Sequence, residues 1–179
     1  MRTGVRAVGT AAVIYAGWLA MLATHEAGHL LHAMLSGGRV VQVSIPLLGF
    51  SQTIVQPNPH ELLVAWGGPI WGVAIPLIAC GACIVLRRRF PDWLRCFAGF
   101  CLIANGAYIG IGWIWRAGDA GDLLRLGTPV WVMVTFGLAC VAAGLWIWHR
   151  APAMSRRSAS ATTPPAHPAG ASYRPDGRG

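Results

Sequence analysis

The segment from Val5 to Leu35, VRAVGTAAVIYAGWLAMLATHEAGHLLHAML, decides the fold of this chain. Between Ala7 and Ala23 it carries no charged residue. As a helix with a rise of about 1.5 Å per residue it would reach about 46 Å, which exceeds the roughly 30 Å core of a bilayer. It also lacks a small-residue cleavage site before its polar residues, so we expect a retained membrane helix and not a removed signal peptide.

Three further apolar segments follow, at about 61–86, 93–115 and 130–148. Each is long enough to cross a bilayer as a helix. Between the first two segments, two β-branched, alternating runs flank the turn at 46–49, which favours a short hairpin within 39–56. We therefore predict an all-α integral membrane protein with four transmembrane helices and a β-hairpin between the first and second.

The composition agrees with a membrane protein and excludes an ordinary soluble domain. Hydrophobic residues make up 55% of the 179 residues and charged residues only 11%, against about 25% in soluble domains. After His149 the chain becomes rich in Ala, Pro, Ser, Thr and Arg without apolar periodicity. We expect one membrane-embedded domain over 1–150 and a disordered cytoplasmic tail over 151–179.

The basic residues indicate topology and do not form a nucleic-acid surface. The net charge is +8, yet the arginines are scattered between apolar segments, so no nucleic-acid partner is expected. In a four-pass chain one side carries nine arginines and the other three, which favours cytoplasmic termini in a bacterial cell membrane. The nine are Arg2, Arg6, Arg87, Arg88, Arg89, Arg95, Arg150, Arg156 and Arg157, and the three are Arg39, Arg116 and Arg125.

The first segment contains the sequence His25-Glu26-Ala27-Gly28-His29. Histidines four residues apart lie on one helix face, where both rings can bind one metal ion. Glu26 can then act as general base towards a water molecule at the metal. Because a carboxylate inside a bilayer costs at least about 2.5–3.5 kcal/mol, its presence calls for a function. The plain alternative is a helix end that emerges among the lipid headgroups.

Two histidines leave a catalytic zinc one protein ligand short. His32 is seven residues from His25, too far along a straight helix to share the ion, so we expect it beside the site or at the interface. Asp119 and Asp122 follow the third segment, on the same side as the motif. Either could be the third ligand, and either could instead cap a short helix over 123–126.

These motifs together resemble the site-2 protease family of intramembrane zinc metalloproteases. The resemblance lies in His25-Glu-Ala-Gly-His29, in Gly67-Gly68-Pro69 of the next segment and in Gly118-Asp119-Ala120-Gly121 after the third, and it covers about residues 18–127. It implies Asp119 as the third zinc ligand in preference to Asp122. It also implies a supporting role for Asn105 and for Gly67, Gly68 and Pro69, although the family's Pro-x-Pro element is absent.

The resemblance implies a zinc endopeptidase that hydrolyses peptide bonds within or near the transmembrane segments of membrane proteins. His25, His29 and Asp119 would bind Zn²⁺, and Glu26 would be catalytic. The hairpin at 39–56 would offer an edge strand to an extended substrate. The family places its active site nearer the cytoplasmic face, whereas the arginine count places this one nearer the outer face.

Two other classes of function compete with a protease. One is a non-catalytic membrane scaffold or metal-binding protein derived from the same fold, in which Gly67, Gly68 and Pro69 serve helix packing alone. A haem protein would need axial ligands on facing helices, and the other segments offer only His60 and His149, at their ends. A transporter or channel subunit is disfavoured because the second and fourth segments carry almost no polar groups.

Overall fold

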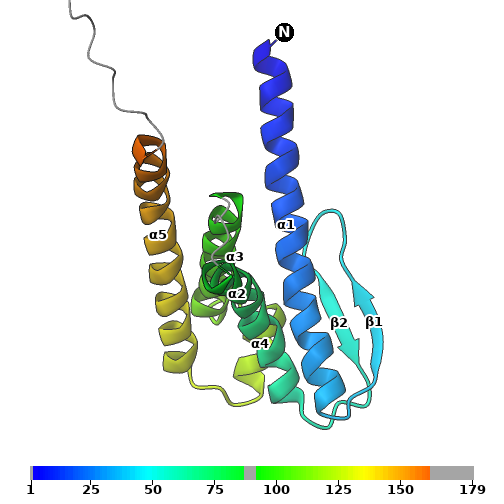
Figure 1. Cartoon of the computed structure of the whole chain (residues 1–179). Helices are drawn as coiled ribbons and strands as arrows, with labels where there is room; N and C mark the ends of the chain where they lie inside the picture. Colours follow the sequence, from blue (N-terminus) through cyan, green and yellow to red (C-terminus); the bar gives the residue numbers. More distant parts are fainter. Residues whose placement is uncertain (1, 87–91, 162–179) are drawn as a thin grey trace, which may run out of the picture.

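The computed structural model describes residues 2–86 and 92–161. Within these ranges the fold is mostly helical, with five helices and one two-stranded antiparallel sheet (Figure 1). The elements are α1 (Arg2–Leu35), β1 (Val40–Ser44), β2 (Gln52–Val55), α2 (Glu61–Val85), α3 (Asp92–Gly112), α4 (Gly118–Arg125) and α5 (Val130–Ala161). The prediction of four long apolar helices with a hairpin after the first is confirmed.

Four of the helices are long and apolar enough to cross a membrane, by length and composition. The qualifying stretches are Arg6–Leu35, Glu61–Cys83, Asp92–Gly112 and Val130–Arg150. Their outward surfaces expose large apolar side chains, for example Val13 on α1, Ile78 on α2 and Leu138 on α5. A surface of this kind suits an apolar surrounding better than water.

The helices pack through close contacts between small residues. α1 packs on α2, α2 on α3, and α3 on α5. At the α1–α2 contact, a Cβ atom on Gly28 would collide with the carbonyl oxygen of Gly67. At the α3–α5 contact, a Cβ on Gly137 would lie 2.6 Å from the Cα of Gly110. Small residues at the contact permit such a close approach of two helices.

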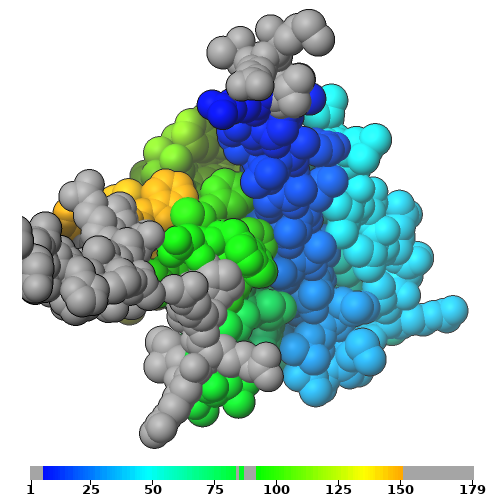
Figure 2. Space-filling model, turned by 45° about the horizontal axis from the view of Figure 1, so that its top comes forward, coloured from blue at the N-terminus to red at the C-terminus, as the bar shows by residue number. Residues whose placement is uncertain are grey.

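The hairpin covers one flank of α1 (Figures 1 and 2). Val43 pairs with Thr53, and the register shifts between Val40 and Gln42. At the turn, the Tyr15 hydroxyl of α1 donates a hydrogen bond to the carbonyl oxygen of Leu47 at 2.8 Å. This hydrogen bond holds the turn of the hairpin against α1.

The glycine-rich segment at 117–129 contains α4, a helix of eight residues, which corrects the expectation of a short helix over 123–126. The N-cap of α4 is Ala117, with no side-chain cap, so neither Asp119 nor Asp122 caps a helix over 123–126. The sequence obscures this helix because two glycines lie at positions 118 and 121, where they weaken helix propensity.

The structure also corrects the start of the predicted tail. α5 continues to Ala161, so residues 151–161 are helical and not disordered. Extending an existing helix avoids the cost of nucleation, and this stretch contains Ala, Met and Arg, which favour helices, although Pro152 adds no backbone hydrogen bond. The predicted tail over 162–179 and the arginine cluster at 87–89 lie outside the described residues.

Candidate metal centre

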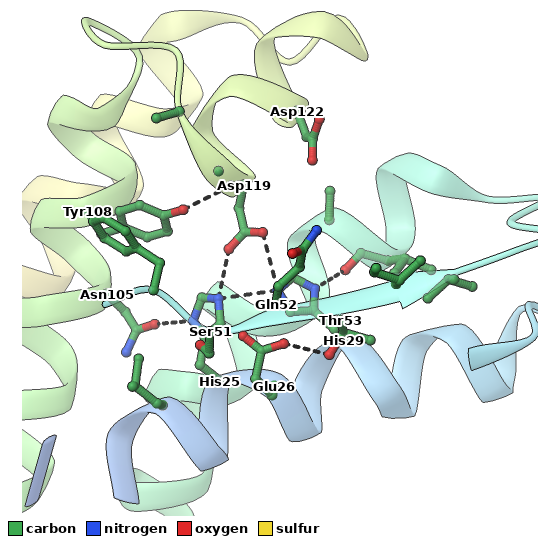
Figure 3. Close-up of a pocket in the computed structure, with 18 of the residues that line it drawn as sticks. His25, Glu26, His29, Ser51, Gln52, Thr53, Asn105, Tyr108, Asp119 and Asp122 are labelled. Carbon is green, nitrogen blue, oxygen red and sulfur yellow. Dashed lines mark hydrogen bonds and ion pairs between the residues drawn. The ribbon is translucent and has the colours of Figure 1, made fainter. Parts of the chain in front are cut away.

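The structure brings together His25, His29 and Asp119 (Figure 3). One ligand atom from each lies within 4.8 Å of the others. The histidines are one turn apart on α1, and their ring centroids are 4.9 Å apart. Asp119 comes from the first turn of α4, on the opposite side of the cluster. The sequence motifs had predicted this trio, and the fold places it around one point.

The Nε2 atoms of both histidines face the Asp119 carboxylate. His25 Nε2 lies 2.7 Å from Asp119 Oδ2, and His29 Nε2 lies 3.3 Å from Oδ1. The two Nε2 atoms are 3.2 Å from each other. Both histidines are buried, so these atoms are largely removed from water.

The Nδ1 atoms of both histidines also face hydrogen-bond acceptors. His25 Nδ1 lies 2.7 Å from Asn105 Oδ1, and the Asn105 amide is oriented by donating through Nδ2 to the Cys101 carbonyl at 2.9 Å. His29 Nδ1 lies 2.8 Å from the Val64 carbonyl of α2, closer than the 3.4 Å that separates it from the Gly68 amide. The predicted support by Asn105 is thus a direct contact with a ring.

This arrangement could hold a cation between the rings. A neutral imidazole carries one N–H, which at each histidine is taken by the acceptor beside Nδ1. Both Nε2 atoms then present lone pairs to one another and to a carboxylate. Two imidazolium rings with their Nε2 atoms 3.2 Å apart would repel each other. A metal ion satisfies all three ligands, and two histidines with one carboxylate form a common catalytic zinc set.

The electrostatics of Asp119 agree with an ionised ligand. Burial alone would raise the pKa of its carboxyl group. When the rings carry protons instead of a metal ion, the hydrogen bonds and charges of His25 and His29 outweigh burial and hold this pKa well below its ordinary value, and a cation at the same point would act in the same direction. The carboxylate therefore stays negatively charged, as a ligand to a divalent cation must be.

Gly68 lets α2 approach the histidine pair. A Cβ atom on Gly68 would collide with Nε2 of both His25 and His29. Gly67 packs against α1 in the same way, and Pro69 is fully buried in α2. The Gly67-Gly68-Pro69 segment therefore packs against the part of α1 that carries the His25 and His29 rings. The same contact between α1 and α2 therefore packs the two helices and supports the cluster.

Glu26 lies beside the cluster and points away from solvent. Only 3% of its surface is exposed. Its Oε2 accepts a hydrogen bond of 2.5 Å from the Thr53 hydroxyl of β2. In Figure 3 the Glu26 carboxylate lies between His25 and Thr53. This position suits a general base for a water molecule held at the cluster.

The cluster opens into a cavity of about 720 Å³. Its walls come from α1, β2, α2, α3 and α4, and its lining includes the polar side chains of Glu61, Asp122 and Arg125. There Arg125 bridges Glu61 at 3.0 Å and Asp122 at 3.3 Å. β2 lines this cavity, and one of its edges has no partner strand in the two-stranded sheet.

Two other residues that the sequence analysis considered, Asp122 and His32, lie outside the cluster. Asp122 is directed towards Arg125, away from the histidines. His32 accepts a hydrogen bond from Trp71 Nε1 at 3.1 Å and contacts the Leu63 carbonyl through Nδ1 at 2.6 Å. It links α1 to α2, consistent with the expectation that it lies beside the metal site.

Sequence reasoning missed Tyr108 and Thr53. The Tyr108 hydroxyl accepts a hydrogen bond from the Asp119 amide at 2.9 Å, and its ring stacks on Phe50 of the hairpin. Tyr108 is three residues after Asn105, so the same-face spacing on α3 could have indicated it. For Thr53, the alternation of side chains along a strand indicates which face of the sheet it lies on, but it does not identify Glu26 as its partner.

Comparisons with protein-family models, with curated proteins and with solved structures give no match for this chain. The argument for function therefore rests on the sequence motifs and on the geometry of the cluster.

Proposed function

We propose that this chain is an intramembrane zinc metalloendopeptidase similar to the site-2 proteases. The observation that carries the proposal is the orientation of both histidine rings by acceptors at Nδ1. Each Nδ1 faces an acceptor, which directs each Nε2 lone pair towards Asp119 and a shared cation. Glu26 lies next to the same point, and a cavity leads to it.

In this proposal His25 and His29 bind zinc through Nε2 and Asp119 through its carboxylate. When bound, zinc supplies Lewis acidity that polarises the scissile carbonyl and lowers the pKa of a water molecule to about 7. Glu26 accepts a proton from the attacking water as its oxygen bonds to the carbonyl carbon. Glu26 then returns that proton to the amine as the carbon–nitrogen bond breaks.

We also propose that the four apolar helices span a bacterial cell membrane with both termini in the cytoplasm. Their apolar exterior and the arginine distribution support this arrangement. The substrates are then membrane proteins, whose peptide bonds are cleaved within or near a transmembrane segment. An extended substrate would lie along the free edge of β2.

The metal is tested by measuring zinc in detergent-purified protein. We expect about one zinc per chain in the wild type and its loss in His25→Ala and in Asp119→Ala, since each removes one of three ligands. Asp122→Ala is the matched control, because it removes the same charge from the same helix and should retain zinc. Zinc retained in Asp119→Ala would contradict the ligand set.

Catalysis is tested with a single-span membrane reporter that carries an epitope at each end, reconstituted with the protein in liposomes. The wild type should produce two fragments. Glu26→Gln should retain zinc and lose at least about 100-fold in cleavage rate. Zinc binding without cleavage by the wild type would favour a non-catalytic metal-binding scaffold.

A further inference from the structure

The hairpin contacts the candidate general base directly. Thr53 Oγ1 on β2 donates to Glu26 Oε2 on α1 at 2.5 Å. The two residues are distant in sequence, and Thr53 lies outside the motifs that suggest a protease. Within residues 2–86 and 92–161, Thr53 is the hydrogen-bond donor that the structure places on the Glu26 carboxylate.

A buried carboxylate needs such a donor. Glu26 is 3% exposed, so water cannot replace a hydrogen bond that is lost. A carboxylate has two oxygens, and a hydrogen bond to one fixes the rotation of the whole group. With Oε2 held by Thr53, Oε1 is left free to accept a proton from water. Efficient proton transfer needs that oxygen within about 3 Å of its donor.

We propose that Thr53 is a positioning residue, which orients Glu26 for proton transfer and makes the hairpin part of the catalytic apparatus. This inference rests on the proposed protease function. This role belongs to the Thr53 side chain and is separate from any main-chain contact of β2 with a substrate. Thr53 acts through Glu26, and the hydroxyl is the group that matters.

The position of Thr53 is itself fixed by contacts at several points. Thr53 pairs with Val43 in the sheet, and Phe50 on the same segment stacks on Tyr108 of α3 with ring centroids 6.4 Å apart. The Gln56 amide donates to the Arg39 carbonyl at 2.8 Å and closes the hairpin at its base. The placement of β2 beside α1 is therefore transmitted to Glu26.

The first test compares Thr53→Val, Thr53→Ser and wild type on the reporter in liposomes. Valine keeps the shape but removes the hydroxyl, so kcat should fall about ten- to hundredfold while KM changes less than about twofold. Serine keeps the hydroxyl and should restore most of the rate. Zinc content should be unchanged in both variants. Equal rates for Thr53→Val and wild type would overturn the proposal.

The second test does not depend on activity. A double-mutant cycle of Thr53→Val and Glu26→Ala is measured by thermal unfolding in detergent, with and without zinc. If the two side chains interact, the double variant should lose less in Tm than the sum of the single losses. Thr128→Val is the control, because the buried Thr128 hydroxyl has no hydrogen-bond partner among the described residues. If the losses in Tm of the two single variants simply add up in the double variant, an interaction between Thr53 and Glu26 is contradicted.

Failure of this inference can be told apart from failure of the proposed function. If the wild type does not cleave the reporter, the protease proposal fails, whereas the cycle still tests the Thr53–Glu26 contact. If the wild type cleaves and Glu26→Gln does not, Thr53→Val at the wild-type rate refutes the positioning role alone.

Discussion

Gly68 determines how much room the metal-binding rings have. The α1 helix presents both Nε2 atoms towards α2, and the backbone of Gly68 lies directly against them. Elsewhere in the same helix, Gly81 has open space where a Cβ would lie. The two glycines have similar helical surroundings but opposite consequences for the cluster, so they form a matched pair for mutation.

We expect Gly68→Ala to weaken zinc binding about 10–100-fold, because the added methyl group displaces the ring nitrogens from the ion. Alanine is a better helix former than glycine by about 1 kcal/mol, so helix propensity alone predicts a gain in stability. Zinc affinity is measured by competition with a coloured chelator in detergent. Gly81→Ala should bind zinc as the wild type does, and equal affinities for Gly68→Ala and Gly81→Ala would refute this role of Gly68.

At the scale of elements, α4 decides which acid joins the histidines. Its first amides lack intrahelical partners, as in any helix, and the Tyr108 hydroxyl of α3 accepts the hydrogen bond of one of them, at Asp119. Gly118, at φ +54°, allows the chain to turn tightly beside that hydroxyl. Asp119 is thereby directed inwards, and Asp122, almost one turn later, faces Arg125.

We expect Tyr108→Phe to weaken zinc binding about fivefold. The variant removes one hydrogen bond, with a net value of about 1 kcal/mol, from the residue that carries the third ligand. Zinc affinity in detergent is again the measurement. Tyr15→Phe removes a hydroxyl that contacts the hairpin turn and should leave the affinity unchanged. If Tyr15→Phe lost zinc affinity and Tyr108→Phe kept it, α4 would be positioned by something other than Tyr108.

The same elements show how far the sequence could predict the site. His25 and His29 were predictable because the helical period alone places them on one face. The hairpin was predictable from alternation and turn residues. α4 was not, because its tertiary contacts outweigh its glycines. The partners Thr53 and Tyr108 depend on how separate elements pack, which local patterns do not encode.

For the whole molecule, the cluster lies near one end of the helix bundle. His29, Gly68 and Asn105 are each about two helical turns, or about 10 Å, from the ends of α1, α2 and α3 at Leu35, Glu61 and Gly112. All three ends lie on the same side, away from the N-terminus of α1 (Figure 1). Water entering from that side would cross only about a third of a 30 Å bilayer core.

The arginine distribution predicts which side this is. The two ends of α2 carry exposed side chains at His60, next to the site end, and at Leu86, at the far end. In a cysteine-free background that retains zinc, His60→Cys should react with a membrane-impermeant maleimide in intact bacterial cells. Leu86→Cys should react only after permeabilisation, because its end carries the arginine excess. The reverse pattern would place the site on the cytoplasmic side, and equal labelling of both would contradict a membrane-spanning α2.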